Sequence, residues 1–170
     1  MYNTNMPKID WTAKVKEALD RTEFMAISTC GEDGSWTNPV AFAYGERLEL
    51  FFISMMQSKH SKNILTNPNV SVAIFKTERF PSGDVLGLQL RGKASHLTTQ
   101  KDIKEAGRYY FGRSQKNDEF REKTSERGGL EAHWQFFKII PTEAWCFDSR
   151  VFGEERVQVD LVNLKLKLNF

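Results

Sequence analysis

The sequence alternates apolar stretches with tight turns, and this alternation limits the fold more than any other feature. Residues 31–34, Gly-Glu-Asp-Gly, are rich in the residue types that hairpin turns need, and they separate apolar stretches at residues 24–30 and 36–44. A second tight turn at residues 45–46 leads into a third stretch at residues 48–54. Strands joined by such short turns predict an antiparallel sheet.

Later segments extend this pattern. Residues 98–127 alternate in charge and predict a helical excursion, broken near Gly112 and closed by Gly128 and Gly129. A helix is also predicted at residues 10–21, where Asp10 can cap it. Further strands are predicted at residues 70–76, 85–97, 134–140, 142–147 and 156–161, and at the alternating tail Leu164, Leu166, Leu168 and Phe170. The chain therefore predicts one mainly β (α+β) domain over residues 1–170, an antiparallel barrel of six or more strands with flanking helices.

Composition excludes several functional classes. The 170 residues carry a net charge of only +2, which gives no argument for nucleic-acid binding. No apolar run is as long as a membrane span, and the polar start of the chain shows no secretory signal, so we expect a cytosolic protein. Cys30 and Cys146 are expected to be buried thiols in a reducing compartment.

The usual catalytic motifs are absent. The sequence contains no nucleophile elbow, no phosphate loop and no dinucleotide fingerprint, so no catalytic residue is nominated. His60, His96 and His133 lie on different predicted elements, and no metal site is expected.

The strongest candidate for a binding site is a short helix opened by Ser58 and ended by residues 67–68, Asn-Pro. Lys59, His60 and Lys62 fall in its first turn, where the helix dipole disfavours positive charge. A bound phosphate would convert this unfavourable arrangement into a site, whereas a solvated basic face is the alternative interpretation.

Two strands offer weaker candidates. Gln89 lies on the polar side of its predicted strand beside Gly87, whose missing side chain would let a flat ligand approach; an exposed polar face with a bulge glycine is the alternative. Pro39 interrupts the strand that contains Asn38 and Val40, so this position is expected at an edge or a bulge.

Trp145 lies on a late strand. A large aromatic side chain there is usually part of the core, but it can instead close over an aromatic cofactor.

Taken together, these features resemble the pyridoxamine 5'-phosphate oxidase-like, FMN-binding split-barrel superfamily. Residues 59–70, Lys-His-x-x-Asn-Ile-x-x-Asn-Pro-x-Val, are similar to a run in a small uncharacterised bacterial branch. Residues 87–94, Gly-Leu-Gln-x-x-Gly-Lys-Ala, resemble the same branch. Residues 137–145, Phe-Lys-Ile-x-Pro-x-x-x-Trp, and 148–153, Asp-Ser-Arg-Val-Phe-Gly, fit its pattern.

The resemblance implies a split barrel and a homodimer with FMN at the interface. In this scheme Ser58, Lys59, His60 and Lys62 would hold the phosphate, and Gln89 would bind the flavin. The remaining implied contacts come from Asn38, Val40 and Ser54 at the rim of the flavin ring, and from Trp145 and Arg150 of the partner chain.

The chain also departs from the true oxidase. It lacks that enzyme's Arg-x-Val-Leu type strand and its Arg-x-His substrate motif, so oxidation of pyridoxamine phosphate is not expected. The first hypothesis is an FMN-dependent oxidoreductase of unknown substrate, acting on a small molecule or using NAD(P)H. The alternatives are a non-catalytic flavin carrier or redox sensor, and a relative that uses haem or the deazaflavin F420.

Overall fold

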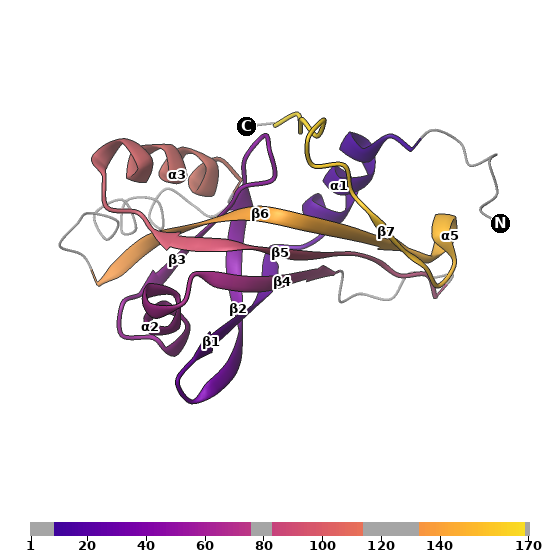
Figure 1. Ribbon diagram of the computed structural model, residues 1–170. Coiled ribbons are helices and arrows are strands. Elements are labelled where there is room, and N and C mark those ends of the chain that lie inside the picture. The colour runs from indigo at the N-terminus through magenta and orange to yellow at the C-terminus, as the bar shows by residue number, and fades with distance from the viewer. Residues whose placement is uncertain (1–8, 76–82, 114–132, 169–170) are drawn as a thin grey trace.

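The computed structural model describes residues 9–75, 83–113 and 133–168 (Figure 1). Its helices are α1 (Trp11–Asp20), α2 (Lys59–Thr66), α3 (Gln100–Arg113) and α5 (Ser149–Phe152). Its strands are β1 (Phe24–Gly31), β2 (Gly34–Tyr44), β3 (Leu50–Met55), β4 (Asn69–Phe75), β5 (Leu86–His96), β6 (Trp134–Asp148) and β7 (Arg156–Gln158).

The strands form one antiparallel sheet that closes on itself. Their order is β3-β2-β1-β4-β5-β6-β7, and an additional pairing between β3 and β6 completes the barrel. The β1–β2 hairpin turns at residues 31–34, as its Gly-Glu-Asp-Gly sequence predicts. The prediction of a mainly β fold with flanking helices, consistent with a split barrel, is therefore confirmed.

The segment on either side of Pro141 corrects the sequence prediction. Two strands were predicted there, whereas β6 is one continuous strand of 15 residues. Gly92 lies opposite Pro141, and the register between β5 and β6 shifts at this point. Because this irregularity accommodates the residue without a ladder donor, the strand passes through the proline.

Two apolar clusters fill the structure. The larger one lies inside the barrel and includes Val15 and Leu19 of α1, which are fully buried. The smaller one packs α3 against β2, β3 and β6 through Ile103, Ala106 and Tyr109. The barrel interior is thus closed by α1, while α3 covers a separate face.

Other local predictions need correction. Leu48 was placed in a strand but has a φ of 65° in the turn before β3. Leu164 and Leu166 are buried as expected, yet the tail forms no strand among the described residues; instead Leu166 N–H donates to the carbonyl of Glu46. Cys30 is exposed rather than buried, and only Cys146 is a buried thiol.

The predicted helical excursion is confirmed in its first half, where α3 runs as far as Arg113, one residue after Gly112. Residues 114–129 of that prediction lie outside the described residues, as do Lys76, Pro81 and Phe170. Among the helices that are described, none is long and apolar enough to cross a membrane.

The irregularity in β6 generates a test with two glycines. A Cβ at Gly92 would lie 2.5 Å from the backbone carbonyl oxygen of Ile140, so Gly92→Ala should lower the free energy of unfolding by about 1–3 kcal/mol. The matched change is Gly107→Ala, inside α3, where the added Cβ would lie no nearer than 3.6 Å to any other atom. This change should raise the free energy of unfolding by roughly 0.5–1 kcal/mol. Urea denaturation of both variants measures this difference, and equal effects would contradict our account of the β5–β6 crossing.

Candidate functional site

Helix α2 forms where local sequence signals predict it. The Ser58 side chain caps its first turn by accepting from the N–H of Ser61, and the chain leaves the helix at Asn67, directly before Pro68. The helix follows β3 after a short turn, so its N-terminus lies beside the end of that strand (Figure 1). This brings Ser54 of β3 close to Ser58 and His60.

These three side chains form a compact hydroxyl–imidazole group. Ser54 Oγ lies 2.7 Å from His60 Nε2 and 3.0 Å from Ser58 Oγ, and Ser58 Oγ lies 3.3 Å from the same imidazole nitrogen. Ser54 and His60 are each 5% exposed. We call Ser54, Ser58, Lys59, His60 and Lys62 the α2 cluster.

The charges of the α2 cluster are uneven. Burial lowers the pKa of His60, which favours a neutral imidazole at neutral pH, so the lysines carry the positive charge. Lys59 pairs with Asp33 of the β1–β2 turn, and its hydrogen bond lowers the pKa of that carboxyl group. Lys62 is exposed on the helix surface.

Sequence reasoning missed the residues that attach α2 to the barrel. The Asn63 amide is 5% exposed and donates to Thr29 Oγ1 at 3.0 Å. A Cβ at Gly31 would lie only 2.2 Å from Asn63 Oδ1, so this glycine is needed where the helix meets the hairpin. The sequence did contain a signal for this contact. Asn63 follows His60 by three residues, so the two side chains lie on the same face of the short helix.

Asn38 and Val40 lie on the core-facing side of β2, in register with Ile27 and Met25. Val40 is buried, while the Asn38 amide is half-buried and donates to the carbonyl of Pro39. Over residues 34–41, β2 pairs with β1 alone among the described strands, because its pairing with β3 covers only residues 42–44. The predicted edge at Pro39 is therefore confirmed.

Gln89 and Trp145 are directly opposite each other on β5 and β6. Both point to the outer face of the barrel, and Trp145 is 37% exposed, so this tryptophan is not a core residue. Gly87 is explained differently from the prediction: a Cβ there would lie 2.9 Å from the backbone oxygen of Ile74 on β4, so close strand packing requires the glycine. We call Gln89 and Trp145 the outer-face pair.

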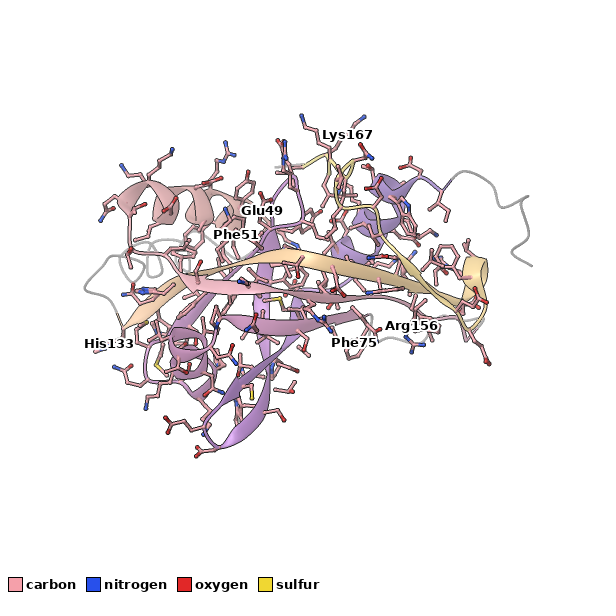
Figure 2. The ribbon with its side chains drawn as sticks, in the orientation of Figure 1. Glu49, Phe51, Phe75, His133, Arg156 and Lys167 are labelled. Carbon is pink, nitrogen blue, oxygen red and sulfur yellow. The ribbon has the colours of Figure 1, made fainter. Side chains whose placement is uncertain are left out.

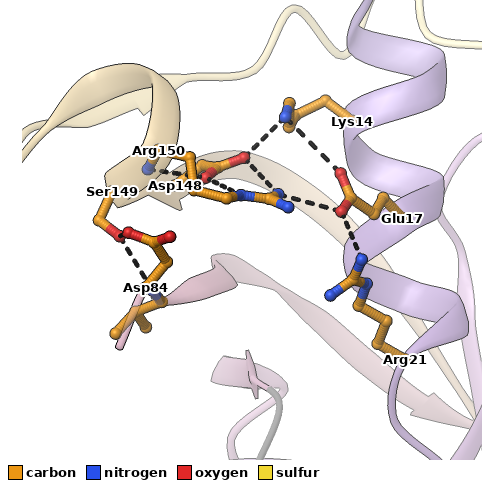
Figure 3. A network of polar contacts seen from close by, with 8 residues as sticks. Lys14, Glu17, Arg21, Asp84, Asp148, Ser149 and Arg150 are labelled. Atoms are coloured by element: carbon orange, nitrogen blue, oxygen red, sulfur yellow. Dashed lines mark hydrogen bonds and ion pairs between the residues drawn. The ribbon is translucent and has the colours of Figure 1, made fainter. Parts of the chain in front are cut away.

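Arg150 lies in an ion-pair network that joins α5 to α1 (Figure 3). Its guanidinium group donates to Asp148 at 2.8 Å and to Glu17 at 3.0 Å, and Lys14 approaches the same Asp148 carboxylate at 2.6 Å. Burial alone would raise the pKa of Asp148, but the hydrogen bonds from Arg150 and Lys14 outweigh it and lower the pKa from 3.8 to about 2. The network gives Arg150 a structural role in the single chain.

The predicted site residues thus fall into separate places. The structure brings Ser54, Ser58 and His60 into contact at the start of α2, where Lys59 and Lys62 also lie. Asn38 and Val40 lie on the core-facing side of β2. The outer-face pair lies on the other side of the sheet, and Arg150 lies in the network with α1.

The protein is an antiparallel barrel in which helix α2 begins with basic and hydroxyl side chains. Comparison with known proteins identifies the family that shares this fold. The family model for pyridoxamine 5'-phosphate oxidase matches residues 11–134. The chain belongs to this family. No curated protein matches the sequence.

Solved structures share the fold at low sequence identity. A conserved hypothetical protein of Mycobacterium tuberculosis is 15% identical, with a TM-score of 0.68 over 94% of this chain and 97% of its own. A FAD-binding protein of Mesorhizobium loti is 17% identical, with a TM-score of 0.59 over 78% of this chain and 88% of its own. A haem-binding protein of Mycobacterium smegmatis is 11% identical, with a TM-score of 0.69 over 92% of this chain and 60% of its own.

The network around Asp148 should make stability sensitive to acid. Because the folded pKa is depressed, the carboxylate's contribution is complete above pH 4 and should be lost as the pH falls from about 4 to about 2. Asp148→Asn should reduce the free energy of unfolding at pH 7 by about 3–5 kcal/mol and flatten this dependence. Denaturant titrations across that pH range, with the exposed Glu154→Gln as control, measure both effects; an unchanged acid slope in Asp148→Asn would contradict the assignment.

Proposed function

We propose that this protein binds FMN and acts as an FMN-dependent oxidoreductase. The observation that carries the proposal is the α2 cluster, which gathers two lysines and two hydroxyl groups at a helix N-terminus in a chain of this family. The FAD-binding relative supports a flavin in general, and the length of the family match supports the common fold.

The residues of the α2 cluster fit a phosphate group. A dianionic phosphate accepts charge-assisted hydrogen bonds from ammonium groups, hydroxyl groups and the first N–H groups of a helix. The neutral His60 suits a role in holding the hydroxyl groups of Ser54 and Ser58. The carboxylate of Asp33 competes for Lys59, so phosphate binding would exchange one partner of this lysine for another.

FMN, when bound, supplies hydride or electron transfer, while the protein binds it, orients it and excludes water. In this proposal Asn38 and Val40 contact the rim of the ring, and the unpaired edge of β2 supports this because it leaves backbone groups open to a ligand. The proposal includes a homodimer with FMN at its interface, a cytosolic location, and a small-molecule substrate or NAD(P)H as electron donor.

A spectrum of the purified protein tests the cofactor. We expect flavin absorption bands that bleach on addition of a reductant such as NADPH and return in air. Bound flavin that is inert to every reductant would favour a carrier or redox sensor. A Soret band would favour haem, as the haem-binding relative suggests, and a colourless protein that does not take up added FMN would contradict flavin binding.

The phosphate contact can be tested separately by comparing FMN with riboflavin, which lacks the phosphate. Each lysine contact should be worth on the order of 1.5–3 kcal/mol, so Lys59→Ala/Lys62→Ala should weaken FMN by at least about 100-fold and riboflavin little. Fluorescence titration measures both affinities, and Lys101→Ala/Lys104→Ala on α3 is the matched control for lost charge. Equal losses for the two ligands would refute the assignment.

A further inference from the structure

A groove lies between helix α3 and the C-terminal tail of the chain. Its volume is about 980 Å³, and its walls are formed by Glu46 of the turn before β3, by Arg108 and Gly112 of α3, and by residues 165–168 of the tail. Figure 1 shows α3 and the tail on one side of β6 and α2 on the other. The groove is therefore separate from the α2 cluster, and none of the predicted site residues lines it.

Two leucines fix the tail beside the groove. Leu164 and Leu166 are 4% and 2% exposed, and the N–H of Leu166 donates to the carbonyl of Glu46 at 2.7 Å. Because burial alternates along the tail, Lys165 and Lys167 face outward. In a segment with this alternation, residues two positions apart are separated by roughly 7 Å. Figure 2 shows Lys167 at the outer surface, on the same side of β6 as α3.

Positive charge dominates the groove. Arg108, Lys165 and Lys167 contribute three cations, whereas Glu46 contributes one carboxylate. Lys165 Nζ lies 4.0 Å from Glu46 Oε2, and both side chains are more than half exposed, so water screens this pair and leaves the lysine available to another anion. Among the described residues, no carboxylate lies within ion-pair distance of Arg108 or Lys167. The groove thus holds cations that the described part of the chain does not neutralise.

The dimensions of the groove suit a small molecule. Cavities that hold such ligands usually measure about 300–1,000 Å³. Arg108 and Gly112 are four positions apart and share a face of α3, so the missing side chain of Gly112 leaves room beside the guanidinium group. A guanidinium group can donate two parallel hydrogen bonds to one phosphate or carboxylate group. The two lysines offer separate point charges to a second anionic group.

We propose that this groove binds a small polyanion, that is, a molecule with at least two phosphate or carboxylate groups. Arg108 binds one of these groups and the two lysines bind another, while Glu46 weakens binding by repulsion. A nucleic acid fits less well, because Glu46 interrupts the cations and the net charge of the chain is only +2. The inference goes beyond the proposed function and does not depend on FMN.

The experiment is isothermal titration calorimetry with three probes. Pyrophosphate and citrate carry several negative charges, on phosphate and on carboxylate groups respectively, and acetate is the singly charged control. Wild-type protein is compared with Lys59→Ala/Lys62→Ala, which lacks the cations of the α2 cluster and so isolates binding at the groove. Each variant of the groove is then made in this background.

The groove variants should change affinity in opposite directions. Lys165→Ala/Lys167→Ala should weaken both polyanions by at least about 10-fold, whereas Glu46→Gln should strengthen them by about two- to fivefold. Lys101→Ala/Lys104→Ala is the matched control, because it removes the same charge from α3 outside the groove, and it should change affinity by less than about twofold. These side chains are exposed, so the variants should fold, and circular dichroism checks this.

Several results would overturn the inference. Polyanion binding that disappears in Lys59→Ala/Lys62→Ala would place the anions at the α2 cluster instead. Equal losses in the groove variant and in the α3 control would indicate a diffuse basic surface. Acetate that binds as tightly as the polyanions, or polyanions that do not bind at all, would also contradict the groove. Tighter binding of pyrophosphate would identify phosphate as the preferred group, and tighter binding of citrate would identify carboxylate; either supports the proposal.

Discussion

Strand β6 is the constraint on which the rest of the structure depends. Residues 134–139 pair with β3 and close the barrel, whereas residues 145–147 pair with β7, and β5 accompanies the strand on its other side. Between these two segments lies Pro141, opposite the register shift at Gly92. A proline can occupy this point because the register shift interrupts the ladder with β5, and at the same point β6 changes its other neighbour from β3 to β7. Because β3 and β7 pair with different parts of β6, the first part of this strand closes the barrel and the last part extends beyond the closure.

Polar residues are buried mainly where α2 meets the closed end. Thr29, Ser54, His60, Ser61, Asn63 and Gln135 are all less than a tenth exposed. In the part of the chain that the structure describes, every buried polar side-chain atom has a hydrogen-bond partner. This layer of hydroxyl, amide and imidazole groups buries less apolar surface than aliphatic side chains would. Its hydrogen bonds, however, fix the start of α2 and the hydroxyl groups in defined positions. This end of the barrel is therefore organised for polar contacts, while the opposite end is secured by the ion pairs of Asp148.

The parts that sequence could predict are those that local chemistry determines. Ser58 and Pro68 delimit α2 through capping and a missing donor, and the glycines at residues 31 and 34 delimit the hairpin, so neither needs the tertiary structure. Pro141 misled the prediction because its tolerance depends on Gly92, 49 positions earlier in the sequence. The alternation of Leu164 and Leu166 correctly indicated burial but not pairing, since alternation reports which side chains are covered and not what the backbone bonds to. The separation of Gln89 from Asn38 escaped prediction for a similar reason, because whether the two side chains share a face is set by register across four strands.

The α2 cluster and the outer-face pair lie on separate surfaces and offer two kinds of polar contact. The α2 cluster presents cations and hydroxyl groups, which are groups that suit an anion such as phosphate. The outer-face pair presents an amide beside an indole, which can select for the shape and hydrogen-bonding edge of an aromatic ring. The same barrel can carry different side chains on these two surfaces, so family membership alone does not determine the substrate.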